Sequence, residues 1–149
     1  MKLINEMKLT IKALSINESF ARSTVAAFCV PLNLNLDELT EIKTAVSEAV
    51  TNCVVHAYPN CEGDIKINVK LYENKIYISI SDEGVGIENF EKAREPFFTT
   101  KPEEERSGMG FTVMESFMDK IDVKKNGRNG VTVVMEKFLK NSNLNAIGV

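Results

Sequence analysis

Glu48, Asn52 and His56 follow one another at intervals of four residues. On an α-helix that turns by about 100° per residue, this spacing places the three side chains along one polar edge. Mg²⁺ prefers oxygen ligands and keeps several waters, so an asparagine carbonyl beside a carboxylate suits a metal that also binds phosphates. The alternative is an ordinary solvated helix surface, because polar residues of this kind usually need no ligand. The stripe therefore indicates a site only if other segments supply the rest of it.

Residues 82–86 read DEGVG and follow the strand-like run KIYISIS. The pattern places Asp82 at the end of a strand, where Gly84 and Gly86 allow the backbone to approach a flat ligand closely. A plain turn is the simpler explanation of an isolated DxGxG.

A second glycine pair, Gly108 and Gly110, lies in SGMGF just before an apolar helical pattern. Free N–H groups and the positive end of the helix dipole favour a phosphate at such a position. The familiar phosphate and kinase signatures GxxxxGK[ST], GxGxxG, VAIK and HRD are absent from the sequence. On its own, this helix start is as ambiguous as the DEGVG turn.

The elements that position these residues follow from periodicity. Residues 7–13 alternate as a strand. The helix after them extends to Pro31, with Ser15 or Asn17 as its N-cap. Glu18 completes a capping-box pattern with Ser15.

A longer helix is predicted over about 37–57, with Asp37 as its cap. Its apolar residues recur at helical spacing, and Pro59 terminates it. This helix carries the polar stripe.

Two hairpins complete the pattern. Residues 64–72 and 75–82 alternate strictly around Glu73 and Asn74, which predicts an antiparallel pair. IDVKK and GVTVVMEKF are expected to pair across NGRNG, after a helix that starts at Gly110. The roughly twenty residues between DEGVG and this helix show weak periodicity, and a compact domain seldom carries so long a loop without functional use.

The composition fits one domain over residues 1–149. The chain is 44% hydrophobic and 26% charged, enough for one core and not comfortably for two. Its net charge of −3 argues against direct nucleic-acid binding. The opening MKLINEMKLTIKAL mixes charges with apolar residues, and no run reaches membrane-spanning length, so we expect a cytoplasmic protein without a membrane partner.

Cys29, Cys53 and Cys61 lack CxxC spacing and are expected to be ordinary reduced thiols.

In their order along the chain, the motifs resemble the Bergerat ATP-binding fold of gyrase-type ATPases, Hsp90 chaperones, histidine kinases and mismatch-repair ATPases. The order is ExxxN on a helix, DxGxG after a strand, a polar segment, GxG opening a helix, and GVT on a late strand, from roughly Asp37 to Val134. The resemblance implies an α+β fold with an open, mixed, mostly antiparallel sheet and helices on one face. ATP would lie between them under a mobile lid at about 87–107, and the tail at about 140–149 would be frayed.

Within that fold, the chain resembles the small serine protein kinases that act as bacterial anti-sigma factors, especially their sporulation group. The resemblance rests on NESFAR, LTEIKTAVSEAVTNCVVHAY, REPFFTTKPEEERSGMGF and MESFMD. It implies a homodimer that binds and inhibits a sporulation sigma factor of the sigma F type. The kinase would use Mg²⁺ and ATP to phosphorylate an anti-anti-sigma protein on serine. The alternatives are a general stress-response kinase of the anti-sigma B type and a non-catalytic, nucleotide-sensing binding module.

Matched by position, the resemblance implies that Glu48 is the general base for the attacking serine hydroxyl and that Asn52 is the magnesium ligand. Asp82 would accept a hydrogen bond from the adenine amino group, with Gly84 and Gly86 beside the ring. Thr132 would support adenine recognition, in a box that reads GVT where many relatives have GTT.

The remaining expected nucleotide contacts surround the phosphates. The resemblance assigns them to Gly108 and Gly110, and we also count Thr99 and Lys101 among the cofactor-binding residues. Lys101 and Arg106, in the lid, are expected to stabilise charge on the transferred group, so Arg106 is counted with the catalytic residues. His56 is expected to be structural, because a histidine kinase carries its phosphorylated histidine on a separate helical hairpin for which the chain has no room.

Overall fold

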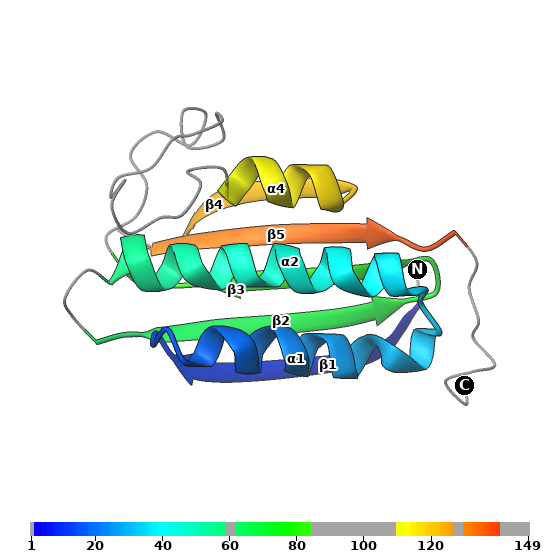
Figure 1. The fold of residues 1–149 in the computed structure, drawn as a ribbon, viewed down its shortest axis with the longest axis horizontal. Helices are drawn as coiled ribbons and strands as arrows, with labels where there is room; N and C mark the ends of the chain where they lie inside the picture. The colour runs from blue at the N-terminus through cyan, green and yellow to red at the C-terminus, as the bar shows by residue number, and fades with distance from the viewer. Residues whose placement is uncertain (1, 59–61, 85–109, 127–129, 141–149) are drawn as a thin grey trace.

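The computed structural model describes residues 2–58, 62–84, 110–126 and 130–140 (Figure 1). Helices and strands are mixed along the chain, as in an α+β fold. In order they are β1 (Leu3–Lys12), α1 (Asn17–Cys29), the short 3₁₀ helix η1 (Val30–Leu32), α2 (Leu36–Asn52), the π-helix η2 (Cys53–Ala57), β2 (Asp64–Tyr72), β3 (Lys75–Ser81), α4 (Gly110–Phe117), β4 (Lys120–Asn126) and β5 (Gly130–Phe138).

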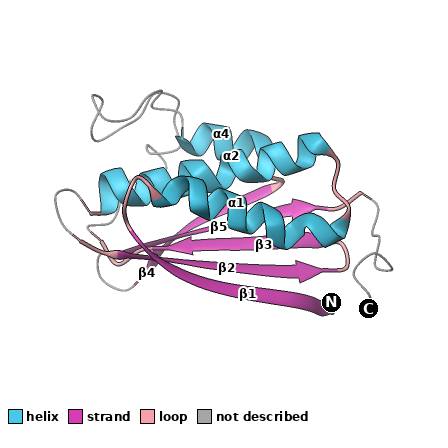
Figure 2. Cartoon of the chain, turned by 60° about the horizontal axis from the view of Figure 1, so that its bottom comes forward, coloured by secondary structure: helices cyan, strands magenta, loops and turns pink. Residues whose placement is uncertain are grey.

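The strands form one open sheet in the order β1-β2-β3-β5-β4, and every described pair is antiparallel. Both predicted hairpins are confirmed, as β2–β3 and as β4–β5. The helices α1, α2 and α4 cover one face of the sheet and leave the other face open (Figure 2). This is the expected architecture, with helices on a single face.

The core lies between the helices and the sheet. Alternate residues of β2, β3 and β5 point toward the helices and are buried, which is why these strands alternate in sequence. They pack against one apolar face of α2, and burying a large aliphatic side chain contributes about 1.5–3 kcal/mol. The fully buried large residues include Ile42, Val46, Val50, Ile65, Ile67, Leu71, Ile76, Ile78, Ile80 and Met135.

Asn35 is the N-cap of α2, two residues before the expected cap at Asp37. Its side chain accepts a hydrogen bond from the Glu38 N–H at 2.8 Å, and the Glu38 carboxylate accepts from the Asn35 N–H at 3.1 Å. The prediction was wrong because this capping box needs an extended residue three positions before Glu38, and Asn35 has that conformation. Asp37 instead lies in the first turn of α2, where it complements the helix dipole.

Among the residues described, no helix is both long and apolar enough to cross a membrane.

The first helix begins at Asn17 without a side-chain cap, so the predicted capping box with Glu18 is also wrong. The Asn17 amide donates to the Lys12 carbonyl at 2.9 Å. The Glu18 carboxylate accepts from the Arg22 guanidinium at 2.8 Å, one turn along the helix. The side chains of Asn17 and Glu18 therefore bind other groups and do not cap the helix. The backbone carbonyl of Ser15 accepts from the Glu18 N–H at 3.2 Å.

Lys137 occupies a core-facing position of β5, with a side chain only 8% exposed. Its ammonium donates to Glu41 Oε2 at 2.6 Å and to the Phe117 carbonyl at 2.9 Å. Phe117 is the last residue of α4, where a cation is favourable to the helix dipole. Lys137 therefore ties β5 to α2 and to the end of α4.

Replacing Glu41 by alanine is expected to lower the free energy of unfolding by about 2 kcal/mol, because it leaves a nearly buried cation short of its anionic partner. The expected loss is below that of a fully buried pair, since the Glu41 side chain is 34% exposed. Urea-induced unfolding measures the difference. Lys12→Ala is the matched control: its ion pair with Asp64 is exposed on both sides, so solvent screens it and its loss should change the free energy of unfolding very little. Similar small losses in both variants would contradict the role given to Lys137.

Candidate functional site

Asp82 lies directly after β3 and is only 5% exposed. Its backbone N–H donates to the Val131 carbonyl at 2.9 Å. Its Oδ1 accepts from the N–H of Gly84 at 2.9 Å and from the N–H of Val131 at 3.3 Å. The carboxylate is thus fixed between its own turn and the start of β5.

The end of α2 reaches the same carboxylate. The thiol of Cys53 donates to Asp82 Oδ2, with 3.6 Å between sulfur and oxygen, and both residues are buried. Cys53 is the residue after Asn52, so this contact joins the helix that carries Glu48 and Asn52 to the DEGVG turn. Segments far apart in the chain therefore meet at one end of the sheet (Figure 1).

Burial determines the protonation of this pair. It raises the pKa of Asp82 above its ordinary value, while hydrogen bonds from Gly84, Val131 and Cys53 act in the opposite direction. Burial, and then the charge of Asp82, raises the pKa of the Cys53 thiol well above its ordinary value, so the thiol stays a donor. A carboxylate in these surroundings favours a ligand that presents N–H donors.

The turn after Asp82 packs tightly on the end of the helix. A Cβ added at Gly84 would lie 2.1 Å from the carbonyl oxygen of Ala57, so only glycine permits this approach. The Tyr58 hydroxyl accepts from the Glu83 N–H at 2.7 Å and donates to the Asp64 carbonyl at 2.9 Å. Tyr58 therefore connects the helix end, the turn and the start of β2.

Glu48 and Asn52 lie on α2 one turn apart, and both are half-buried. The predicted stripe does not continue regularly to His56, because residues 53–57 form a π-helix with a wider turn. Such π-helical turns occur often at functional sites. The α-helical spacing therefore places Glu48 and Asn52 on one edge of the helix, but it does not extend that edge to His56.

The Asn52 amide fits a site for a hydrated cation. Its Nδ2 is buried and makes no hydrogen bond with the described part of the chain. Because amide oxygen and nitrogen exchange by a half-turn, the same position can present an oxygen ligand. Within the described ranges no three His, Cys, Asp or Glu residues gather to bind a metal. Mg²⁺ keeps several waters and binds phosphates, so one amide oxygen from Asn52 suits it as a ligand.

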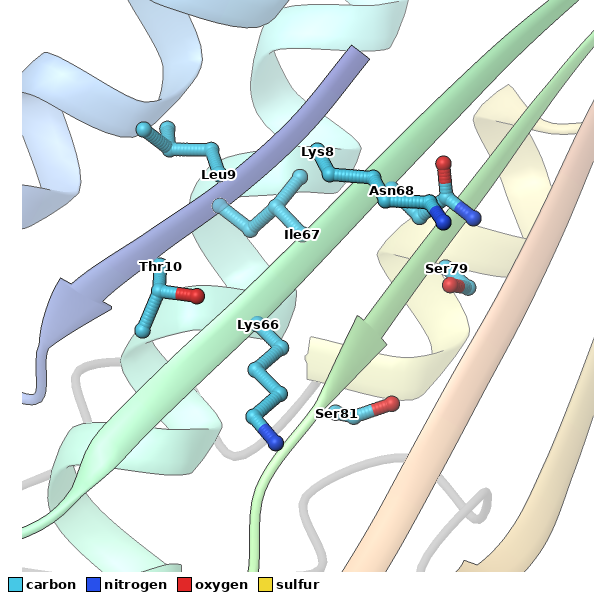
Figure 3. A pocket seen from close by; sticks show the side chains of 8 residues that line it. All are labelled: Lys8, Leu9, Thr10, Lys66, Ile67, Asn68, Ser79 and Ser81. Atoms are coloured by element: carbon cyan, nitrogen blue, oxygen red, sulfur yellow. The ribbon is translucent and has the colours of Figure 1, made fainter. Parts of the chain in front are cut away.

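The backbone of Thr132 lies near Asp82, but its side chain does not approach the Asp82 carboxylate. It pairs with Ser81 across β3 and β5, and the two hydroxyl oxygens lie 2.8 Å apart. Ser81 lines a groove on the open face of the sheet, with Lys8, Leu9, Thr10, Lys66, Ile67, Asn68 and Ser79 (Figure 3). The hydroxyl of Thr132 is thus on the face away from the helices, whereas the Asp82 carboxylate contacts Cys53 on the helix side. Val131, not Thr132, borders Asp82.

The other expected site residues belong to the glycine-rich and polar segments. Gly110 is the first residue of α4, as predicted. The lid at about 87–107 lies outside the described residues, as do Gly86, Thr99, Lys101, Arg106 and Gly108. The tail from residue 141 onward also lies outside them.

Sequence reasoning missed the roles of Cys53, Tyr58 and Val131. Cys53 is a free thiol as expected, and its contact with Asp82 spans 29 residues of sequence. No local pattern indicates such a contact. Tyr58 directly precedes Pro59, and no local pattern indicates its contacts with Glu83 and Asp64.

Comparison with known proteins supports a single family. Residues 12–137 match the family model described as the histidine kinase-like ATPase domain. The chain is 57% identical over 140 residues to the anti-sigma F factors of Bacillus thuringiensis (strain Al Hakam), Bacillus mycoides (strain KBAB4) and Bacillus anthracis (strain CDC 684 / NRRL 3495), covering 93% of this chain and 96% of each relative. The antiparallel sheet with helices on one face agrees with the Bergerat fold of that ATPase family. The chain therefore belongs to the histidine kinase-like ATPase domain family and, within it, to the anti-sigma F factors.

Proposed function

We propose that this chain is a single-domain serine kinase that binds a sigma factor of the sigma F type and phosphorylates an anti-anti-sigma protein. The family supports ATP use, and the chain's similarity to anti-sigma F factors supports a sigma factor partner. The observation that carries the proposal is the contact of Asp82 with Cys53 and Val131, since it joins the end of β3 to the end of α2 and the start of β5. That contact brings together segments that the sequence separates.

Asp82 recognises the adenine base in this proposal. A buried carboxylate that already accepts from two backbone N–H groups is a strong acceptor for the amino group of adenine. Gly84 and Gly86 let the turn lie against the flat ring. Thr132 has no direct contact with the base in this proposal, because its hydroxyl pairs with Ser81 on the open face of the sheet.

Asn52 and the start of α4 serve the phosphates. Asn52 would hold the magnesium ion, which would offset the negative charge of the phosphates. Gly108 and Gly110 would direct backbone N–H groups at the phosphates, where the helix dipole favours negative charge. Thr99, Lys101 and Arg106 would contact the nucleotide from the lid, with Arg106 stabilising the transferred group.

Glu48 is the proposed general base. It lies one turn before Asn52 on α2, along the same edge of the helix. The serine oxygen of the partner attacks the γ-phosphorus in line, the bond from that phosphorus to the ADP oxygen breaks, and Glu48 takes the hydroxyl proton. The products are ADP and a phosphoserine.

The first helix offers a surface for the protein partners. Ile16 and Phe20 are exposed by 79% and 52%, next to the ion pair of Glu18 with Arg22. Exposed apolar side chains beside charged ones are typical of transient interfaces. We assign sigma factor and anti-anti-sigma binding to this surface of a homodimer, and a sigma factor partner would place the activity in the cytoplasm.

The test is phosphate transfer from radiolabelled ATP, with magnesium, to each of two candidate substrates. These are the sporulation anti-anti-sigma protein and its general stress-response counterpart. Label is expected on serine of the sporulation protein only, and chelation of magnesium should abolish it. Transfer to the stress-response protein would favour a kinase of the anti-sigma B type. ATP binding without transfer to either would favour the non-catalytic module.

A further inference from the structure

Within the described ranges, donors approach both oxygens of the Asp82 carboxylate. The N–H groups of Gly84 and Val131 donate to Oδ1, whereas the thiol of Cys53 donates to Oδ2. We propose that Cys53 is a positioning residue, whose thiol sets the orientation of the Asp82 carboxylate and thereby the preference of the site for a base with an exocyclic amino group. This inference rests on the proposed role of Asp82 in binding adenine.

Cys53 is well placed to orient its neighbour. It stands where α2 passes into the π-helix η2, and its backbone N–H donates to the carbonyls of both Ala49 and Val50. Its side chain is 5% exposed, so packing limits the rotation of the thiol. The sulfur lies 3.6 Å from Asp82 Oδ2, and a thiol at this distance donates to the carboxylate oxygen.

The geometry explains why the thiol matters even though a single S–H bond is weak. Two donors on one oxygen still allow the carboxylate plane to turn about its Cβ–Cγ bond. A donor on the second oxygen restricts that rotation, and recognition of an amino group requires a correctly directed lone pair. The effect of Cys53 should therefore depend on whether the base carries an amino group at position 6.

Binding of ATP and of purine riboside triphosphate, which lacks that amino group, tests the inference by calorimetry. In Cys53→Ala, ATP affinity is expected to fall roughly three- to tenfold, the range of one neutral hydrogen bond, while the affinity of the analogue stays within about twofold. Cys53→Ser retains a donor and should recover most of the ATP affinity. Cys53→Val removes the donor without leaving a cavity and should reproduce the loss if the alanine variant folds poorly.

Cys29→Ala is the matched control, because Cys29 is another buried thiol, on α1. It should leave the ratio of the two affinities unchanged. If Cys53→Ala and Cys53→Val lose affinity equally for both nucleotides, the ratio of the two affinities is unchanged. That result would show a structural effect only and would overturn the inference. Failure of the wild-type chain to bind ATP would instead refute the proposed function, so the two failures are distinguishable.

Discussion

Replacing Glu48 by glutamine is expected to lower serine phosphorylation by about 10²- to 10⁴-fold, the range for loss of a general base, while ATP affinity changes little. Glutamine keeps the size of the side chain and removes its ability to take a proton at neutral pH. Single-turnover transfer of labelled phosphate measures the chemical step, and calorimetry measures ATP binding.

The division between binding and transfer follows from the position of Glu48. It lies on α2 one turn before Asn52, whereas Asp82 contacts the residue after Asn52. A residue that acts on the serine proton contributes little to binding of the nucleotide itself. Glu73→Gln, in the exposed β2–β3 turn, is the matched control and should leave both measurements unchanged. Full transfer by Glu48→Gln would remove the kinase role of this residue.

Replacing Asp82 by asparagine is expected to weaken ATP binding by roughly 10- to 100-fold, the range for a hydrogen bond to a charged group. The amide oxygen can still accept from the N–H groups of Gly84 and Val131. The second oxygen becomes an NH₂ group, which cannot accept from an adenine amino group. Calorimetric titration with ATP measures the loss.

The pH dependence of unfolding shows whether the Asp82→Asn variant has lost only affinity for ATP or has also lost its fold. Burial raises the pKa of Asp82 above its ordinary value of 3.8, so the folded chain binds the proton more tightly than the unfolded chain. The contribution of Asp82 to stability is therefore largest at pH below 3.8 and declines as pH rises through the raised value. Asparagine carries no charge, so we expect the variant to stay folded at pH 7 with a weaker pH dependence of unfolding. Asp122→Asn, in an exposed ion pair with Lys124, should change neither property, and unchanged ATP binding in Asp82→Asn would refute the adenine role.

The elements of the fold could be predicted because each depends on residues close in sequence. Strict alternation predicted β2 and β3, and apolar residues at helical spacing predicted α2. The caps could not be predicted in the same way. Asn35, Asp37, Ser15 and Asn17 are all suitable residue types, and the backbone conformation decided which of them became a cap.

The burial of Lys137 shows a similar limit. A lysine in the alternating run of β5 gives no sign that it faces the core, because lysine is usually exposed. Its position depends on Glu41 and the end of α4, which approach it only after the helices pack on the sheet.

By itself, the sequence determined the order of helices and strands and the residue types available for chemistry, because both depend on neighbours along the chain. It also indicated Glu48, Asn52 and Asp82 as candidates. Only the tertiary structure decided that Cys53 reaches the carboxylate of Asp82 and that the hydroxyl of Thr132 lies on the other face. The reason is that strand register selects the face on which each side chain lies, and the packing of α2 on the sheet selects which residue meets it.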